Sequence, residues 1–351
     1  MKKLLDRIFI DGLGGMAQGL FATLIIGTII QQIGLFMGGG TGDLIYELGK
    51  IAAGLTGAGI GVGVARKLEA GHLVIVSAAV VGMIGAFAGK ILSGQVLVDG
   101  NLVLAGPGEP LGAFAAAYLA IEIGILISGK TKLDIILTPL VCIGTGSAVG
   151  LFVGPPISEF MLWLGSLINW VTEQQPFLMG IVVSVLMGMI LTLPISSAAL
   201  GVILNLSGLA AGAATIGCCC NMIGFAVASW RENKFSGFLA QGIGTSMLQI
   251  PNIVRRPLIW LPVILSSAVL GPIGTMLLHM TNNATGSGMG TAGLVGPLMT
   301  WQVMTQSEAG VIVLGKIILI QFILPAAVTL LISEFMRKKK WIRQGDMKLE
   351  L

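Results

Sequence analysis

Residues 230–257, WRENKFSGFLAQGIGTSMLQIPNIVRRP, form a semi-polar stretch that carries basic residues at both ends and lies between strongly apolar segments. Between Lys234 and Pro251 the chain is shorter than the roughly 20 residues that a membrane-spanning helix needs. Backbone of this kind persists at membrane depth only where it is buried in protein or lines a water-filled cavity. The stretch therefore predicts a re-entrant hairpin that lines a transport path, and it favours a transporter or channel over a simple anchor.

The composition places the chain among membrane proteins. Apolar residues make up 55% of it and charged residues 10%, and its 52 glycines suit helices that pack closely in a bilayer. Lys2, Lys3 and Arg7 precede an apolar run, as in a signal peptide, but no small-residue cleavage site and hydrophilic mature region follow. We interpret this run as the first membrane helix.

The cysteines and the charge distribution argue against several other classes. Cys142 and the consecutive Cys218, Cys219 and Cys220 lie in apolar segments without histidines at metal-ligand spacing, so disulfide and zinc sites are both disfavoured. The formal charge of +4 comes from loops and from the basic tail at 337–343, and no soluble basic face is available for a nucleic acid. We therefore expect no metal, no cofactor and no nucleic-acid partner.

Basic residues occur at alternate breaks between the apolar segments. Lys or Arg residues lie before the first segment, at 66–67 and at 130–132, whereas the breaks at 38–43 and 93–110 contain none. By the positive-inside rule the N-terminus is cytoplasmic, and the basic tail places the C-terminus on the same side. The pattern predicts an all-α, multi-pass membrane protein with about ten transmembrane helices and two re-entrant hairpins in its C-terminal half. The predicted spans are 13–36, 44–64, 71–93, 109–129, 134–153, 157–171, 177–200, 202–229, 258–280 and 309–334.

Glycines and prolines interrupt the C-terminal half more than the N-terminal half. Interrupted segments around Pro194 and Pro251 match the pattern of binding sites built from broken helices, and the short segment 291–301 is the second hairpin candidate. We therefore divide the chain into three parts. These are a packing and dimerisation half at 1–130, a substrate-binding half at 131–335 and a basic cytoplasmic tail at 336–351.

The hairpin offers neutral hydrogen-bonding groups and no carboxylate between Gln241 and Asn252. Such a set suits the hydroxyls of a sugar or of another polar neutral solute. Arg255 and Arg256 either anchor the chain at the inner surface or add affinity for an anion.

Pro194 precedes two serines and frees a backbone carbonyl, which a hydroxyl or a ligand could satisfy, although the serines could equally bond their own helix. Asn205 and Asn221 either bond between helices or face a solute. The complete set of candidate solute-binding residues is Ser196, Ser197, Asn205, Asn221, Gln241, Thr245, Gln249 and Asn252.

Two ionisable residues lie inside predicted spans, where charge is costly. Glu122 is a candidate for a structural ion pair or for a proton-coupling group, and Lys316 is close enough to the end of its span to extend toward the outer interface. We expect Asn282 and Asn283 to belong to an ordinary outer loop or, as the alternative, to the rim of the pathway.

The order of these features resembles the membrane component, EIIC, of the bacterial phosphoenolpyruvate-dependent sugar phosphotransferase system, in its glucose-type superfamily. The segments that carry the resemblance are TKLDIILTPLVCIGTGSAVGLFVGPPISEFMLWLGSLI at 131–168, PFLMGIVVSVLMGMILTLP at 176–194 and ENKFSGFLAQGIGTSMLQIPNIVRRP at 232–257. The N-terminal portion looks more like a stand-alone, PfoR-like branch. The resemblance implies a plasma-membrane permease, a homodimer formed through the N-terminal half and an elevator-like movement of the C-terminal half.

Two departures bear on phosphorylation. Where the family carries a substrate-site histidine, this chain has Pro194 to Ser197, and where the family carries a glutamate it has Gln249. The chain also lacks the soluble EIIA and EIIB domains, so separate EIIA and EIIB proteins are the implied partners. It is at most the membrane subunit of a phosphotransferase, and no catalytic residue is identified. The alternatives are a phosphorylation-independent secondary transporter or channel and a PfoR-like membrane sensor.

Overall fold

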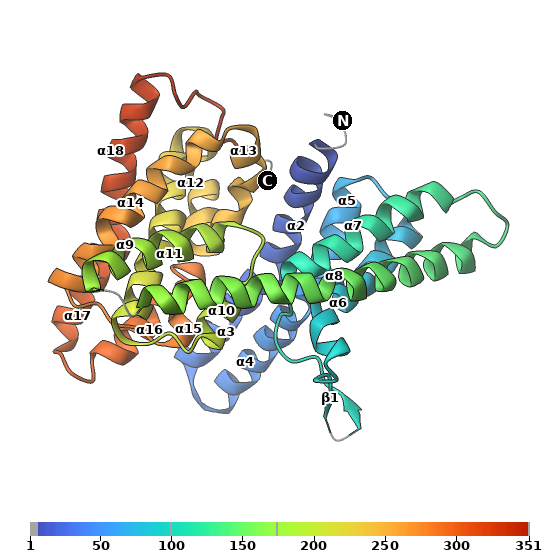
Figure 1. The fold of residues 1–351 in the computed structure, drawn as a ribbon, viewed down its shortest axis with the longest axis horizontal. Helices are drawn as coiled ribbons and strands as arrows, with labels where there is room; N and C mark the ends of the chain where they lie inside the picture. The colour runs from blue at the N-terminus through green and yellow to red at the C-terminus, as the bar shows by residue number, and fades with distance from the viewer. Residues whose placement is uncertain (1–5, 99, 173–174, 350–351) are drawn as a thin grey trace. The chain divides into compact units, whose positions relative to one another are not determined.

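The computed structural model describes residues 6–98, 100–172 and 175–349, and most of these residues are helical (Figure 1). They divide into two compact units, Met1–Met161 and Leu162–Leu351. The boundary lies inside a helix and not at residue 130. The functional halves that we predicted from the sequence stay a prediction, because packing alone defines the compact units.

The first unit consists of helices that glycines hold in close contact. A Cβ atom on Gly19 would overlap the backbone carbonyl of Gly59, so the helices that carry these residues touch through their main chains. Small residues permit this approach where lipid supplies no hydrophobic driving force between helices. The helical elements of this unit are η1 Arg7–Gly12, α2 Leu13–Leu20, η2 Phe21–Ile25, α3 Ile26–Met37, α4 Gly39–Gly54, α5 Thr56–Lys67, α6 His72–Leu92, α7 Pro110–Ile127 and the first part of α8, Asp134–Thr172.

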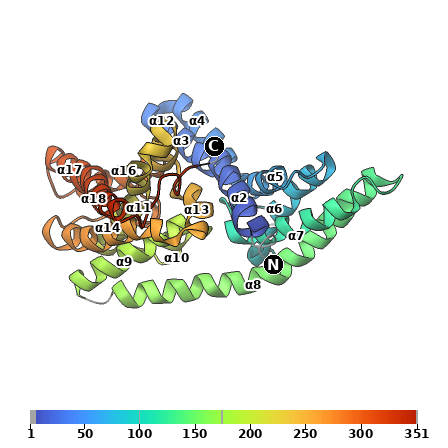
Figure 2. The same ribbon diagram turned by 90° about the horizontal axis from the view of Figure 1, so that it is seen from above.

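Two predicted features of this unit differ in the structure. The span predicted at 44–64 is a pair of helices, α4 and α5, that meet at an angle of 50°. The spans predicted at 134–153 and 157–171 are one continuous helix, α8, with Pro155 and Pro156 inside it (Figure 2). Membrane helices tolerate such prolines where neighbouring groups and local adjustment satisfy the freed carbonyls. A short antiparallel ribbon, β1 Leu97–Val98 with β2 Asn101–Leu102, connects α6 to α7.

The second unit is built around one buried helix, α11, Gly208–Ala228. In the most apolar 18-residue stretch of this helix 94% of the residues are buried, and α9, α14 and α18 surround it. Gly217 on α11 has no room for a side chain, since a Cβ atom there would overlap the carbonyl of Ser184 on α9. The helices of this unit after α8 are α9 Pro176–Thr192, α10 Ser197–Ile203, α11, α12 Trp230–Leu239, η3 Ala240–Gly244, η4 Ser246–Gln249, α13 Ile250–Arg255, η5 Pro257–Trp260, α14 Leu261–Pro272, η6 Ile273–Leu277, α15 Ala284–Ser287, η7 Ala292–Leu294, α16 Val295–Met304, α17 Gly310–Ile317, η8 Ile318–Ile323 and α18 Leu324–Lys338.

The helices confirm the predicted class of all-α membrane protein. Among the described residues seven helices are long and apolar enough to cross a membrane, and the bent α4–α5 pair raises this number to eight. The predicted total of about ten and the two re-entrant hairpins stay predictions. The tail after α18 does not extend away from the unit but turns back toward α12 and α13 (Figure 1).

Candidate functional site

The semi-polar stretch folds into several short helical pieces instead of a single span. α12 and η3 run to Gly244, and Thr245 then adopts an extended conformation (φ −159°, ψ 142°) before η4 and α13 begin. The Thr245 hydroxyl accepts a hydrogen bond from the Met247 amide at 3.2 Å, which caps η4. Pro251 lies in the first turn of α13, where its missing N–H leaves no helical bond unmade.

Three side-chain amides of this stretch form a continuous buried chain. The Gln241 amide donates to Ser229 Oγ at 2.9 Å, and Gln241 Oε1 accepts from Gln249 Nε2 at 2.8 Å. Gln249 Oε1 in turn accepts from Asn252 Nδ2 at 2.8 Å. Gln241 and Gln249 are completely buried, and Asn252 is 6% exposed. We call Gln241, Gln249 and Asn252 the amide cluster.

A second polar network joins four elements around α11. Asn221 Oδ1 accepts from Thr192 Oγ1 at 3.1 Å and from Trp260 Nε1 at 3.2 Å, and Asn221 Nδ2 donates to Ser267 Oγ at 3.4 Å. Thr192 also bonds the Ser246 hydroxyl at 2.8 Å. The Ser246 end of η4 therefore contacts α9, whereas its Gln249 end belongs to the amide cluster.

The other interrupted segments also meet beside α11. Ser197, which begins α10, donates to Gly288 O at 2.6 Å, and Thr215 on α11 donates to Gly286 O at 3.3 Å. Thr291, from the second hairpin candidate, donates to Gly242 O in η3. These contacts join the segment 286–291 to α10, to α11 and to η3.

The remaining predicted site residues lie apart from this centre or make local bonds. Ser196 is half-buried just before α10, and Asn205 is exposed, with a positive φ of 47°, in the turn between α10 and α11. Asn205 lines a shallow surface pocket together with Pro176 and Ser207. The structure thus joins Gln241, Gln249 and Asn252 directly but does not bring Asn205 into their network.

The two ionisable residues predicted inside spans both have partners. Glu122 Oε1 lies 2.6 Å from Arg7 Nε, with side chains 29% and 39% exposed. Lys316 donates to both carboxylate oxygens of Glu308 at 2.8 Å. The Glu122 ion pair agrees with one of our two readings of that residue, and a coupling role stays a prediction.

Sequence reasoning missed several buried polar residues. Glu232 and Arg337 form an ion pair with N–O distances of 2.9 and 3.2 Å, and their side chains are only 3% and 8% exposed. Asn282, which we expected in an ordinary loop, is 1% exposed and donates to Thr215 and Thr300 at 2.8 and 3.0 Å. In the sequence each of these positions is only a polar residue at the edge of an apolar segment. That pattern does not distinguish a residue in a buried hydrogen-bond network from a residue in a loop.

Together these features define a class of protein. The chain is a multi-pass, all-α membrane protein whose second unit encloses a set of neutral hydrogen-bonding side chains beside a fully packed central helix, as in a membrane permease. Within that class it belongs to the phosphotransferase system EIIC family, because the family described as "Phosphotransferase system, EIIC" matches residues 10–349. No curated protein matches the chain. The chain is therefore a membrane permease component of the sugar phosphotransferase system.

Proposed function

We propose that this EIIC protein binds a neutral, hydroxyl-rich solute of the sugar class beside the amide cluster and carries it across the membrane by an elevator-like movement of its C-terminal half, residues 131–335. The observation that supports the proposal is the buried chain from Ser229 through Gln241 and Gln249 to Asn252. Polar groups are rarely buried in a membrane protein, and a buried chain of them is therefore our candidate for the solute site.

The chemistry of the cluster favours a sugar over an ion. Its side chains are amides, each with an oxygen that accepts and an NH₂ group that donates. A sugar hydroxyl also donates and accepts, so it can replace either partner of an amide in the chain. A charged solute would lose its hydration without gaining an opposite charge, because no Asp, Glu, Lys or Arg side chain bonds to the amide cluster among the described residues.

The same observation supports a second candidate, translocation without phosphorylation. Proton transfer from a sugar hydroxyl needs a group whose pKa is near the operating pH, and a primary amide is not such a group. Glu232 lies on the same stretch, but its carboxylate bonds Arg337 and the Gly345 amide. The alternatives of an uncoupled transporter and a PfoR-like sensor follow from this neutral site.

The remaining properties that we propose rest on the family. They are a homodimer formed through residues 1–130, partnership with separate EIIA and EIIB proteins, residence in the bacterial plasma membrane and a cytoplasmic position for both termini. The basic residues of the tail, which lies beside α12 and α13, support the cytoplasmic position.

The test is uptake of radiolabelled glucose and a panel of other sugars into proteoliposomes, with and without phosphotransfer proteins. We expect uptake of at least one sugar, and Gln249→Ala should abolish it while the protein remains folded. Gln306→Ala is the matched control, because Gln306 is exposed and outside the site. Uptake that needs the phosphotransfer proteins supports coupled transport, and uptake that ignores them supports the second candidate. If Gln249→Ala transports like the wild type, the amide cluster is not the site.

A further inference from the structure

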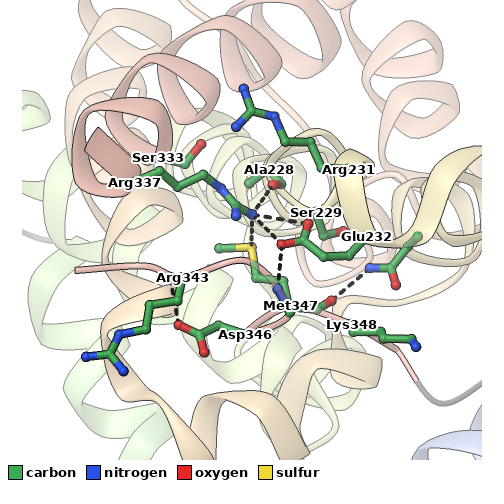
Figure 3. Close-up of polar contacts among 12 residues, drawn as sticks. Ala228, Ser229, Arg231, Glu232, Ser333, Arg337, Arg343, Asp346, Met347 and Lys348 are labelled. Carbon is green, nitrogen blue, oxygen red and sulfur yellow. Dashed lines mark hydrogen bonds and ion pairs between the residues drawn. The ribbon is translucent and has the colours of Figure 1, made fainter. Parts of the chain in front are cut away.

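The C-terminal segment, residues 339–349, lies against the stretch that carries the amide cluster. After α18 ends at Lys338, the chain turns at Lys340 and Gly345, which have φ values of 61° and 94°. Ile342 and Met347 are 2% and 0% exposed although they lie in a tail that is basic overall. The segment is therefore packed into the unit, and Figure 3 shows Met347 beside Glu232 and Arg337.

The backbone of this segment satisfies the side-chain amides of the site. Gln249 Nε2 donates to Met347 O at 3.0 Å, and Asn252 Nδ2 donates to Lys348 O at 2.9 Å. Asn233 Nδ2 donates to Met347 O at 2.8 Å, and Asn233 Oδ1 accepts from the Leu349 amide at 2.8 Å. Two members of the amide cluster, Gln249 and Asn252, thus each donate one N–H to a carbonyl oxygen of the C-terminal segment.

The Glu232–Arg337 ion pair holds the segment at its other end. Glu232 Oε1 accepts from the Gly345 amide at 3.3 Å, and Arg337 lies 3.8 Å from Met347 Sδ (Figure 3). Arg337 also donates to Ala228 O at 2.9 Å, at the C-terminal end of α11. One buried ion pair therefore connects the central helix, α12, α18 and the C-terminal segment.

We propose that residues 345–349 are a displaceable lid that occupies the solute site from inside the protein. In this conformation the carbonyls of Met347 and Lys348 take the positions that solute oxygens take when a sugar is bound. Solute and lid compete for Gln249 and Asn252, so the lid lowers the affinity for solute and blocks the site when no solute is present. The proposal rests on the proposed function, since it concerns the regulation of the same site.

The bonds from the lid to the amide cluster are of a kind that a sugar can replace. The bonds of Gln249 and Asn252 to the lid each join a neutral amide to a neutral carbonyl, and a hydroxyl oxygen accepts the same N–H with little net change in free energy. The lid residues carry no acid that binds the amide cluster, and Asp346 instead accepts from the Arg343 amide at 2.8 Å and lies 3.8 Å from Arg256 Nε. Glu232 and Arg337 themselves lie outside the lid, but opening breaks the bond from the Gly345 amide to Glu232 and the contact of Arg337 with Met347 Sδ.

A reversible disulfide tests this competition. Asn233→Cys combined with Leu349→Cys places two thiols at neighbouring positions, because the Leu349 amide now donates to Asn233 Oδ1. Phe335→Cys with Trp341→Cys is the matched control, because these two exposed rings are in contact outside the lid. The four native cysteines are buried. Binding of radiolabelled glucose to the purified full-length protein is measured before and after oxidation, and again after reduction with dithiothreitol.

We expect oxidation of the 233–349 pair to weaken glucose binding at least about tenfold and reduction to restore it, whereas the control pair binds equally in both states. Truncation after Gln344 should tighten binding about tenfold, because it removes the competing occupant. Unchanged affinity in both the locked and the truncated protein would overturn the lid.

Hydrogen exchange separates failure of the lid from failure of the proposed function. In the reduced protein, amides of residues 345–349 should exchange at least about tenfold faster than those of α11, and the 233–349 disulfide should slow them. If they exchange as slowly as α11, the segment is a fixed strap and the lid is refuted. If they exchange fast but no variant binds any sugar, the lid stands as a movable segment and the proposed substrate class is wrong.

Discussion

Replacing Glu232 by Gln should destabilise the second unit strongly, because it removes half of a buried ion pair. The Glu232 Oε2 atom accepts a hydrogen bond from Arg337 Nη2, and Oε1 lies 2.9 Å from the same nitrogen and accepts from the Gly345 amide. Gln keeps the size of the side chain and one acceptor oxygen but has no charge. Arg337, with a side chain only 8% exposed, would then retain Ala228 O and Met347 Sδ as its partners.

The expected loss is about 3 kcal/mol in the free energy of unfolding, since breaking a buried pair from one side leaves an uncompensated charge and typically costs 3–5 kcal/mol. For a unit of this size such a loss lowers the melting temperature by roughly 10 °C. Glu334→Gln is the matched control, because Glu334 pairs with Arg231 at 2.9 Å but their side chains are 31% and 61% exposed. Exposed pairs contribute about 1 kcal/mol or less.

The assay is thermal unfolding of the purified protein in detergent, followed by a double-mutant cycle of Glu232→Gln with Arg337→Met. Removing both partners should cost less than the sum of the single changes, because neither charge is then left buried alone. Equal melting temperatures for Glu232→Gln and Glu334→Gln would refute the reasoning, as would strictly additive effects in the cycle.

Three further changes have distinct expected results. Gly217→Val should prevent folding, because a Cβ atom at this position overlaps the backbone of Ser184. The protein should then lose its monodisperse peak in size-exclusion chromatography. Gly315→Val is the control and should retain the peak, because Gly315 faces open space. Asn282→Ala should cost about 2 kcal/mol in thermal unfolding, because it leaves buried hydroxyls without their amide donor, and a loss below 0.5 kcal/mol would contradict the network. Glu122→Gln should lower stability by about 1 kcal/mol or less, since its ion pair is partly exposed, and its uptake should respond to a proton gradient as that of the wild type does. A proton dependence that is present in the wild type and lost in the variant would instead assign coupling to Glu122.

The class of fold could be predicted from the sequence, because each membrane helix is marked by the hydropathy of its own consecutive residues. It did not predict α8 as one helix, because the glycine and the two prolines at 154–156 normally end a helix. Whether the helix continues through them depends on neighbouring groups that satisfy the freed carbonyls, and these groups cannot be identified from the local sequence. It also did not predict the bend between α4 and α5, because an apolar segment carries no signal for a 50° change of direction. The number of spans depends on such choices and was therefore the weaker part of the prediction.

The sequence named Gln241, Gln249 and Asn252 as candidates because they lie within one stretch, eight and three positions apart, and the structure adds that they bond one another. Partners far apart in sequence were not predictable. Glu232 and Arg337 lie 105 residues apart, and Asn282 lies 67 residues from Thr215. Each of these residues meets its hydrogen-bonding or ion-pair partner only after the helices have packed, so the pairing cannot be predicted from the local sequence.

The complete satisfaction of the amides limits which solutes the protein can accept. A solute that displaces the C-terminal segment exposes the N–H groups of Asn233, Gln249 and Asn252, which now bond Met347 O and Lys348 O. An unsatisfied buried N–H costs about 1–3 kcal/mol, so a solute must offer acceptor oxygens in similar positions or lose that much at each group. A site built to hydrogen-bond hydroxyls rejects an analogue without them far more strongly than an apolar pocket rejects a change in size. A deoxy sugar that lacks one of the contacting hydroxyls should therefore compete poorly with the parent sugar, whereas a sugar changed at a position facing away from these amides should compete normally.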